Sequence, residues 1–230
     1  MGYSKKDQLE KLRRERKKNK ADRKRKENIR GKLVRFLIVC EGSKTEPQYF
    51  RSLIRSCTST VREVTIEGEG RATVSLVKRT QEIKDELESK NAMSFDRVWI
   101  VFDKDDFSDF NKAIEKAHGL GFECAWTNEA FELWYYLHFS YLETGISRED
   151  YIEKLEGFFR KRMGDANFKY EKSDPNIYNL LKKYGCENSA KKYAEKLRGL
   201  YTDKNYAKHK PCTMVDQLVG ELEDPEPLLK

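Results

Sequence analysis

The sequence of 230 residues contains few of the residues that build cross-linked or metal-tethered scaffolds. Its five cysteines are an odd number and form no CxxC pair, which disfavours a disulfide framework and a zinc ribbon. Only three histidines are present, so a histidine-rich metal site is excluded. No apolar run approaches the roughly 20 residues that span a bilayer. We therefore expect a protein of the reducing cytoplasm that does not enter a membrane.

Charge, in contrast, is abundant, and the positive charge is concentrated at one end of the chain. Charged residues make up 37% of the sequence and hydrophobic residues 38%, which leaves enough apolar side chains for a core. Residues 1–30 contain 14 Lys or Arg and 5 Asp or Glu, whereas the other 200 residues contain 32 basic and 34 acidic side chains. The excess positive charge therefore lies in one segment, residues 1–31, which we call the basic arm.

The basic arm has too few apolar residues to pack as a core helix, and two interpretations remain open. Lysine and arginine side chains bind phosphate backbones by releasing counterions, so the arm is suited to nucleic acid. Blocks of like charge are also typical of solvated tails without a partner. We favour nucleic-acid contact, and the residues expected to make it are Arg13, Arg14, Lys17, Lys18, Arg23 and Arg25.

Short apolar runs alternate with amphipathic segments in the first two thirds of the chain. The pattern predicts strands over residues 33–40, 61–66, 97–102 and 122–126, and helices over residues 45–57, 72–89, 108–118 and 128–139. Strands that alternate with helices indicate an α/β domain with a largely parallel sheet. We place this domain at residues 32–145. After residue 145 the strand pattern stops, and residues 146–230 are expected to form a helical C-terminal region.

Two acidic turns follow predicted buried strands. Glu41 comes directly after the first strand, and Asp103 and Asp105 come directly after the third, with Asp106 next to them. Ligands of open parallel sheets bind beyond the carboxyl ends of the strands, so these carboxylates are expected to meet there. Carboxylate oxygens suit Mg²⁺ or Mn²⁺, and such an ion supports phosphodiester cleavage. The spacing thus predicts a metal site formed by Glu41, Asp103, Asp105 and Asp106.

Each of these residues also has a purely structural interpretation. Glu41 or Glu46 can complement the positive end of the helix that follows, and the aspartates can cap the helix near residue 108. The two acidic turns together are a more specific signal than either turn alone. If the site is catalytic, Glu46 is expected to support its ligands, while Lys44 and Lys104, which flank the turns, are expected to contact substrate phosphate.

Two further candidates lie in the aromatic segment over residues 128–139. A carboxylate among aromatic side chains needs a partner, so Glu132 is either part of the catalytic site, as a metal ligand or general base, or a buried salt bridge or helix cap. His138 is either a proton donor to a leaving oxygen or a core residue with its hydrogen bonds satisfied. Six residues separate the two side chains, which places them on different faces of a helix.

These motifs resemble the RloB family, which is related to the Toprim fold. The resemblance rests on Glu41-Gly42 with Thr45-Glu46 and Tyr49-Phe50, on VWIVFDKDD at residues 98–106, on the box at residues 128–139, and on Pro211-Cys212-Thr213 with Val215. It covers residues 33–222 and departs from the family pattern at Glu129-Ala130 and Lys210 without touching the acidic turns.

The resemblance also implies a function, which composition and spacing alone do not indicate. It implies a Toprim-like α/β fold with Mg²⁺ at Glu41, Asp103 and Asp105, and a nuclease that acts on DNA or RNA in bacterial antiphage defence beside an ABC-type ATPase partner. A non-catalytic nucleic-acid-binding or regulatory subunit of such an ATPase complex is the alternative. The sequence leaves the substrate and the oligomeric state open, a homo-oligomer included.

Overall fold

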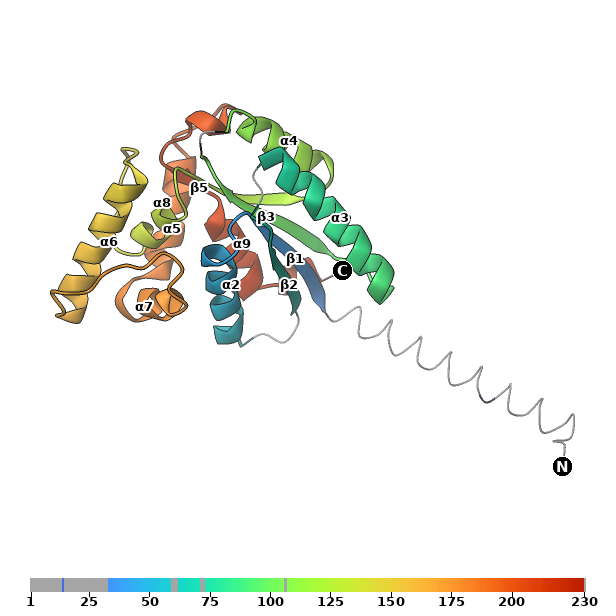
Figure 1. Ribbon diagram of the computed structural model, residues 1–230, viewed down its shortest axis with the longest axis horizontal. Helices are drawn as coiled ribbons and strands as arrows, with labels where there is room; N and C mark the ends of the chain where they lie inside the picture. Colours follow the sequence, from blue (N-terminus) through green and yellow to red (C-terminus); the bar gives the residue numbers. More distant parts are fainter. Residues whose placement is uncertain (1–13, 15–32, 59–61, 71–72, 106, 230) are drawn as a thin grey trace, which may run out of the picture.

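The computed structural model describes residue 14 and residues 33–58, 62–70, 73–105 and 107–229. In that part of the chain, five strands form one sheet in the order β2-β1-β3-β4-β5, with helices packed on both of its faces (Figure 1). The strands are β1 (Val34–Cys40), β2 (Arg62–Gly68), β3 (Arg97–Asp103), β4 (Glu123–Asn128) and β5 (Cys212–Thr213).

The central strand β1 explains why the sheet needs two covered faces. It pairs in parallel with β2 on one side and with β3 on the other, and all seven of its residues are buried. Phe36 and Ile38 belong to the apolar cluster on one face, while Leu37 and Val39 belong to the cluster on the other. An unbroken apolar run is what a strand covered on both faces requires, so the run at residues 33–40 is correctly interpreted as a buried parallel strand.

Helices divide between the two faces of the sheet (Figure 1). One face is covered by α3 (Thr73–Asn91) and α4 (Phe110–Gly119), whose apolar residues pack on Phe102 and Trp126. The other is covered by α2 (Thr45–Ser56), α5 (Glu132–Leu137) and α9 (Val215–Glu223). The aromatic segment at residues 128–139 therefore forms a shorter helix than expected, because Asn128 still belongs to β4.

Three more helices extend the second layer: α6 (Arg148–Met163), α7 (Ile177–Tyr184) and α8 (Glu187–Arg198). Their side chains Tyr151, Leu155 and Leu181 share one apolar cluster with Phe36 of the sheet. This confirms a mostly parallel α/β sheet flanked by helices and followed by a helical C-terminal region, while the boundaries at residues 31 and 145 stay predictions. None of the helices in the described part of the chain is both long enough and apolar enough to cross a bilayer.

The expectation that no strand follows residue 145 is wrong. After α8 the chain returns to the sheet, where Cys212 and Thr213 form β5, antiparallel to β4. Two residues are too short to produce the alternating pattern that identifies a strand in a sequence. The hydroxyls of Thr127 and Thr213 lie 2.9 Å apart in this buried pair, and Thr213 Oγ1 also accepts the Val215 N–H.

Replacing Thr213 by Val is expected to lower the free energy of unfolding by about 1 kcal/mol, because it removes both bonds and leaves the Thr127 hydroxyl buried without its partner. Thermal unfolding measures the effect as a fall in melting temperature of about 2 to 4 °C. The exposed Thr202→Val variant is the matched control and should melt like the original protein. An equal melting temperature in both variants would mean that β5 contributes nothing to stability.

Candidate metal and phosphate site

The first acidic turn lies where the order of the sheet reverses. The chain leaves β1 for β2 on one side and returns for β3 on the other, so the carboxyl ends of β1 and β3 border the crevice in which α/β sheets bind ligands. Glu41 follows β1 there, and its N–H donates to the Val101 carbonyl at 2.8 Å. The Asp103 N–H donates to Glu41 Oε2 at 3.3 Å. The two acidic turns are therefore joined, as the sequence predicts.

The second acidic turn is held by two groups from distant parts of the chain. The Phe131 N–H, just before α5, donates to Asp103 Oδ2 at 3.0 Å. Arg148, at the start of α6, donates from Nη2 to Asp105 Oδ1 at 2.8 Å, and the same Nη2 lies 3.8 Å from Asp103 Oδ2. Helix α4 begins later, at Phe110, so the expectation that Asp103 and Asp105 cap it is wrong.

Glu46 lies in the first turn of α2 and folds back beneath the turn that carries Glu41. It is 8% exposed, and its Oε2 has no hydrogen-bond partner within the described part of the chain. A Cβ at Gly42 would lie 2.0 Å from this oxygen, so a larger residue at position 42 would displace the carboxylate from this place. Glu46 does sit at the positive end of a helix, but a buried acceptor without a donor is costly unless a proton or a cation satisfies it.

Glu132 completes the group of carboxylates from the first position of α5. It is 1% exposed, and its Oε1 accepts a hydrogen bond of 3.0 Å from the Tyr170 hydroxyl. Among the described residues its hydrogen-bond partner is thus a neutral phenol and not a basic side chain, so the buried salt bridge, one of the structural alternatives for Glu132, is not formed there. We call Glu41, Glu46, Asp103, Asp105 and Glu132 together the carboxylate cluster.

Burial and mutual repulsion make the cluster favourable to positive charge. Burial raises the pKa of Glu41 from its usual 4.5 to about 7, and the nearby Asp105 and Glu46 carboxylates add to the rise. Burial is also the main reason why the pKa of Asp103 lies well above its usual value, and the charges of Glu46 and Glu132 raise it further. Burial also raises the pKa of Glu46. Closely packed carboxylates titrate in this way when a counter-ion is missing.

Arg148 is the site residue that the sequence did not single out. A capping box places it, because the Ser147 hydroxyl accepts the Asp150 N–H at 3.1 Å and the Asp150 carboxylate accepts the Ser147 N–H at 3.2 Å. The Ser-x-x-Asp pattern predicts a helix start at this point. Nothing in the sequence relates that helix to the acidic turns more than 40 residues earlier, so the pairing with Asp105 emerges only from the fold.

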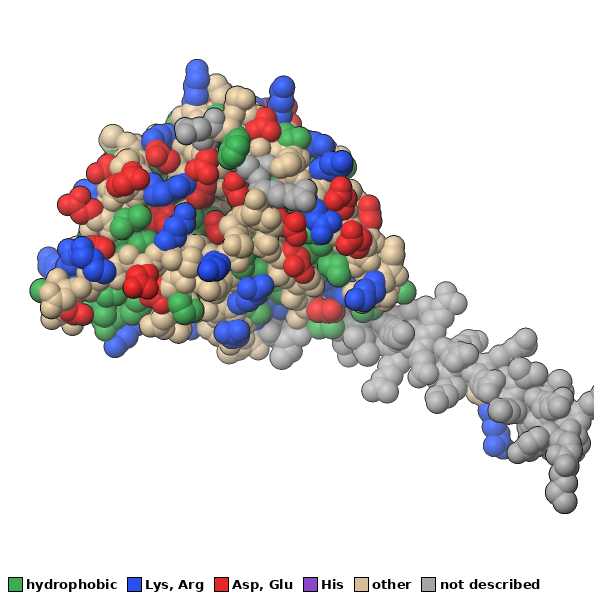
Figure 2. All heavy atoms as spheres, viewed as in Figure 1, with side chains coloured by type: hydrophobic (Ala, Val, Ile, Leu, Met, Phe, Trp, Pro, Cys, Tyr) green, Lys and Arg blue, Asp and Glu red, His purple; other side chains and the backbone are tan. Residues whose placement is uncertain are grey.

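A cleft of about 740 Å³ opens beside Asp105. Its lining carries three basic side chains, Lys104, Arg148 and Lys210, and three acidic ones, Asp105, Glu129 and Glu149, and Lys210 is paired with Glu129. Lys104 Nζ also donates to the Asp105 carbonyl, whereas Lys44 is exposed and does not line the cleft. Elsewhere on the face shown in Figure 2, acidic and basic side chains are interspersed. The cleft therefore joins carboxylates to cations at the edge of the sheet.

Several predicted site residues lie outside the described residues. They are Asp106 and, in the basic arm, Arg13, Lys17, Lys18, Arg23 and Arg25. Arg14 is described as helical and exposed. Nucleic-acid contact by the arm stays a prediction.

Comparison with known proteins identifies the relatives of this chain. The sequence model of the RloB-like proteins matches residues 36–222, which is most of the chain. The chain belongs to the RloB-like family. No curated protein and no solved structure gave a significant match. The RloB-like region begins in β1 and ends in α9, so it contains both acidic turns and the β5 return to the sheet.

The carboxylate cluster of this RloB-like chain suits a hard divalent cation, although it is not a closed cage. Among the described residues, no group of three or more His, Cys, Asp or Glu side chains is placed to hold a metal ion by itself. Mg²⁺ does not need such a cage, because it keeps several waters and binds through one or two carboxylates together with substrate phosphate. Glu41 and Asp103 are the carboxylates that could contribute such oxygens, and the unpartnered Oε2 of Glu46 lies buried close by.

Replacing Arg148 by Gln is expected to destabilise the metal-free RloB-like protein by about 1 kcal/mol, since it removes a partly buried cation from Asp103 and Asp105. Melting curves in EDTA should show the full loss, and saturating Mg²⁺ should reduce it, because the ion supplies the missing positive charge. Arg148→Lys keeps the charge and should lose less. A loss that is the same with and without Mg²⁺ would show that Arg148 and the ion do not act on the same carboxylates.

Proposed function

We propose that this protein is a Mg²⁺-dependent nuclease that cleaves phosphodiester bonds. The observation that supports the proposal is the hydrogen-bonded junction of Glu41 and Asp103 at the point where strand order reverses, with the pKa of both carboxylates raised by burial. Such a junction favours a cation. A bound Mg²⁺ polarises a phosphoryl oxygen and lowers the pKa of a coordinated water.

Under this proposal the residues of the site have three tasks: to bind the ion, to orient its ligands and to hold or pass a proton. Glu41 and Asp103 would hold the ion together with water and substrate phosphate, with Asp105 beside them. The Phe131 N–H fixes the orientation of Asp103, and the Tyr170 hydroxyl fixes that of Glu132. Glu46 is buried with a raised pKa, so it is suited to hold or pass a proton next to the ligands.

Substrate binding would fall to the cations beside the cluster. Lys104, Arg148 and Lys210 line the cleft next to Asp105, and a phosphate held there would lie close to the ion. The basic arm would add contacts to the nucleic-acid backbone that do not depend on sequence. The proposal therefore names a polyanionic substrate, DNA or RNA.

One observation favours a non-catalytic alternative. Arg148 already neutralises Asp105 without an ion, as a structural ion pair would. In that case the protein would bind nucleic acid or regulate an ATPase partner. A role in antiphage defence beside an ABC-type ATPase is compatible with the nuclease and with the non-catalytic subunit, and it rests on the RloB-like family alone.

A cleavage panel separates the two versions. Purified protein is incubated with duplex DNA, single-stranded DNA, total tRNA and messenger RNA, in Mg²⁺, in Mn²⁺ and in EDTA. Cleavage of one class that requires the metal and is absent from the Asp103→Asn protein supports the nuclease. Binding without cleavage, repeated in the presence of the neighbouring ATPase, would favour the non-catalytic subunit.

A further inference from the structure

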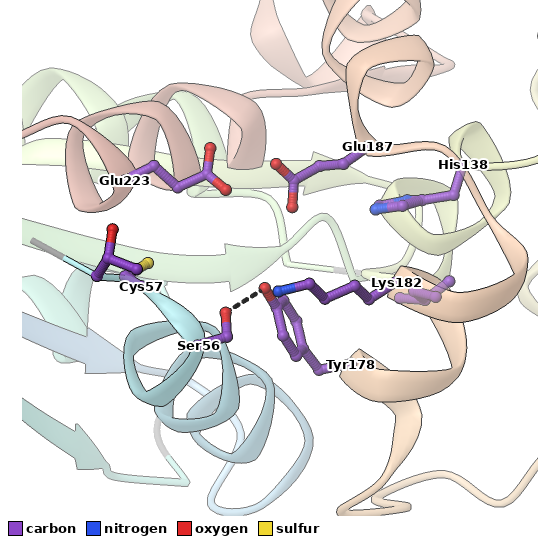
Figure 3. Close-up of a pocket in the computed structure, with 9 residues that line it drawn as sticks. Ser56, Cys57, His138, Tyr178, Lys182, Glu187 and Glu223 are labelled. Atoms are coloured by element: carbon purple, nitrogen blue, oxygen red, sulfur yellow. Dashed lines mark hydrogen bonds between the residues drawn. The ribbon is translucent and has the colours of Figure 1, made fainter.

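A second cavity lies on the other side of α5 from the carboxylate cluster and plays no part in the proposed nuclease. It has a volume of about 350 Å³ and lies where α2, α5, α7, α8 and α9 meet (Figure 3). Its polar lining comes from Ser56, Cys57, Thr58, His138, Tyr178, Lys182, Glu187 and Glu223. This volume is at the lower end of the range for small-molecule sites, so the cavity has room for a small ligand.

His138 presents a hydrogen-bond acceptor to this cavity. The side chain is 4% exposed, and its Nδ1 lies 2.9 Å from the Trp134 carbonyl, which can only accept. The proton therefore resides on Nδ1. Burial lowers the pKa of His138 to about 4, so the ring is neutral and Nε2 carries a lone pair. Figure 3 shows the ring nitrogen pointing into the cavity, and within the described part of the chain no hydrogen bond occupies Nε2.

The two hydroxyls on the opposite wall are also left as acceptors. Ser56 Oγ donates its hydrogen to the Leu53 carbonyl at 2.8 Å. The Tyr178 hydroxyl must then be the donor in its 2.6 Å contact with Ser56 Oγ. Both hydrogens are thus committed within the protein, and only oxygen lone pairs remain for a ligand.

Two carboxylates complete the acceptor lining. Glu187 at the start of α8 and Glu223 at the end of α9 point toward one another across the cavity (Figure 3). Lys191 contacts both, with Nζ 3.1 Å from Glu187 Oε1. One ammonium cannot balance two carboxylates, and burial together with the Glu223 carboxyl raises the pKa of Glu187. Apart from the exposed Lys182, the wall therefore sets two carboxylates against one ammonium.

We propose that this cavity binds a small organic cation bearing several N–H donors, an aliphatic ammonium or a guanidinium, held by Glu187 and Glu223 with His138 Nε2 as a neutral acceptor. An anion is disfavoured because the two carboxylates face it; of the ammonium groups nearby, Lys191 is already paired with both carboxylates, and Lys182 is an exposed side chain beside the Tyr178 ring. The occupant is independent of the proposed nuclease.

The test is calorimetric titration of the full chain with putrescine and agmatine at constant ionic strength. Tetramethylammonium has the charge without N–H donors, and butane-1,4-diol has the length without the charge. We expect putrescine or agmatine to bind with a dissociation constant of about 1 mM or lower, and neither control compound to bind. Glu187→Gln and Glu223→Gln should each weaken binding at least about tenfold, because each removes a charged acceptor. Glu195→Gln, an exposed change on the same helix α8, should bind like the original protein.

A second readout keeps the test decisive if a variant folds poorly. Long-range proton–nitrogen spectra of the unaltered protein report the His138 ring, and the bound cation should shift Nε2 while Nδ1 stays protonated. Equal binding by all variants would reveal general charge attraction and overturn the proposal. No binding of either cation, or a shift of Nε2 by Zn²⁺ alone, would overturn it as well.

Discussion

Replacing Asp103 by Asn is expected to reduce metal-dependent cleavage by more than about 100-fold. Loss of groups that merely orient a metal ligand costs about 10- to 100-fold, and Asp103 is proposed to be a ligand itself. The amide keeps the size of the side chain and can still accept the Phe131 N–H through its oxygen, so the fold should persist. The measurement is the initial rate of cleavage on the substrate class that the panel identifies.

Two comparisons interpret that loss. Asp85→Asn makes the same chemical change on the exposed face of α3, where the carboxylate accepts a hydrogen bond from Gln81, and should cleave normally. Glu41→Gln should be as inactive as Asp103→Asn, and the double variant no worse, since residues that act as a unit are not additive. Independent, multiplying losses would show that the two residues do not serve one ion.

The second large effect is on stability and concerns Mg²⁺ and pH together. In the absence of metal, the folded protein holds a proton on Glu41 up to a pKa of about 7, whereas the unfolded chain releases it near the usual 4.5. Between these values the folded state binds more protons, so the free energy of unfolding falls as pH rises. Asp103 and Glu46, whose pKa values are also raised, act in the same direction. The metal-free melting temperature should therefore be highest near pH 5 and fall toward pH 8.

The size of this effect follows from the Glu41 shift. A shift from 4.5 to about 7, discounted by about half because the carboxylate is partly solvated, amounts to about 1 to 2 kcal/mol. Mg²⁺ competes with the proton, so it should stabilise little at pH 5 and by about 2 to 3 kcal/mol at pH 8 when present at about 100 times its dissociation constant. Each kcal/mol corresponds to about 2 to 4 °C in melting temperature.

Glu41→Gln supplies the control for this second prediction. The amide does not titrate, so the metal-free variant should melt higher than the original protein at pH 8 and respond less to Mg²⁺. A metal-free melting temperature that rises from pH 5 to pH 8 in the original protein would contradict the raised pKa values. If Mg²⁺ raised the melting temperature of Glu41→Gln as much as that of the original protein, the ion would bind at a site that does not include Glu41.

The centre of the sheet could be predicted from the sequence because strands β1 and β3 are each marked twice, by a buried apolar run and by an acidic turn. The run at residues 33–40 is apolar on both faces, and Glu41-Gly42 ends it with a turn. Strand β3 likewise ends in Asp103. Since parallel strands end at one edge, the meeting of Glu41 and Asp103 follows from strand order alone.

The rest of the site depends on contacts that no local pattern encodes. Arg148 reaches Asp105 from a helix expected to lie outside the α/β domain, and Tyr170 reaches Glu132 from a loop without periodicity. The Nε2 of His138 faces a cavity formed by five helices, so its environment depends on how all of them pack. Long-range packing of this kind is set by shape, which composition and spacing do not record.

The most direct test of the central claim is a titration of the purified protein with Mn²⁺, followed by the paramagnetic resonance signal of the free ion. The carboxylate cluster is predicted to remove Mn²⁺ from solution in the original protein and in Asp85→Asn. The double variant Glu41→Gln, Asp103→Asn is predicted to leave the ion free, while melting cooperatively. Undiminished Mn²⁺ binding by that double variant would contradict the assignment of the site.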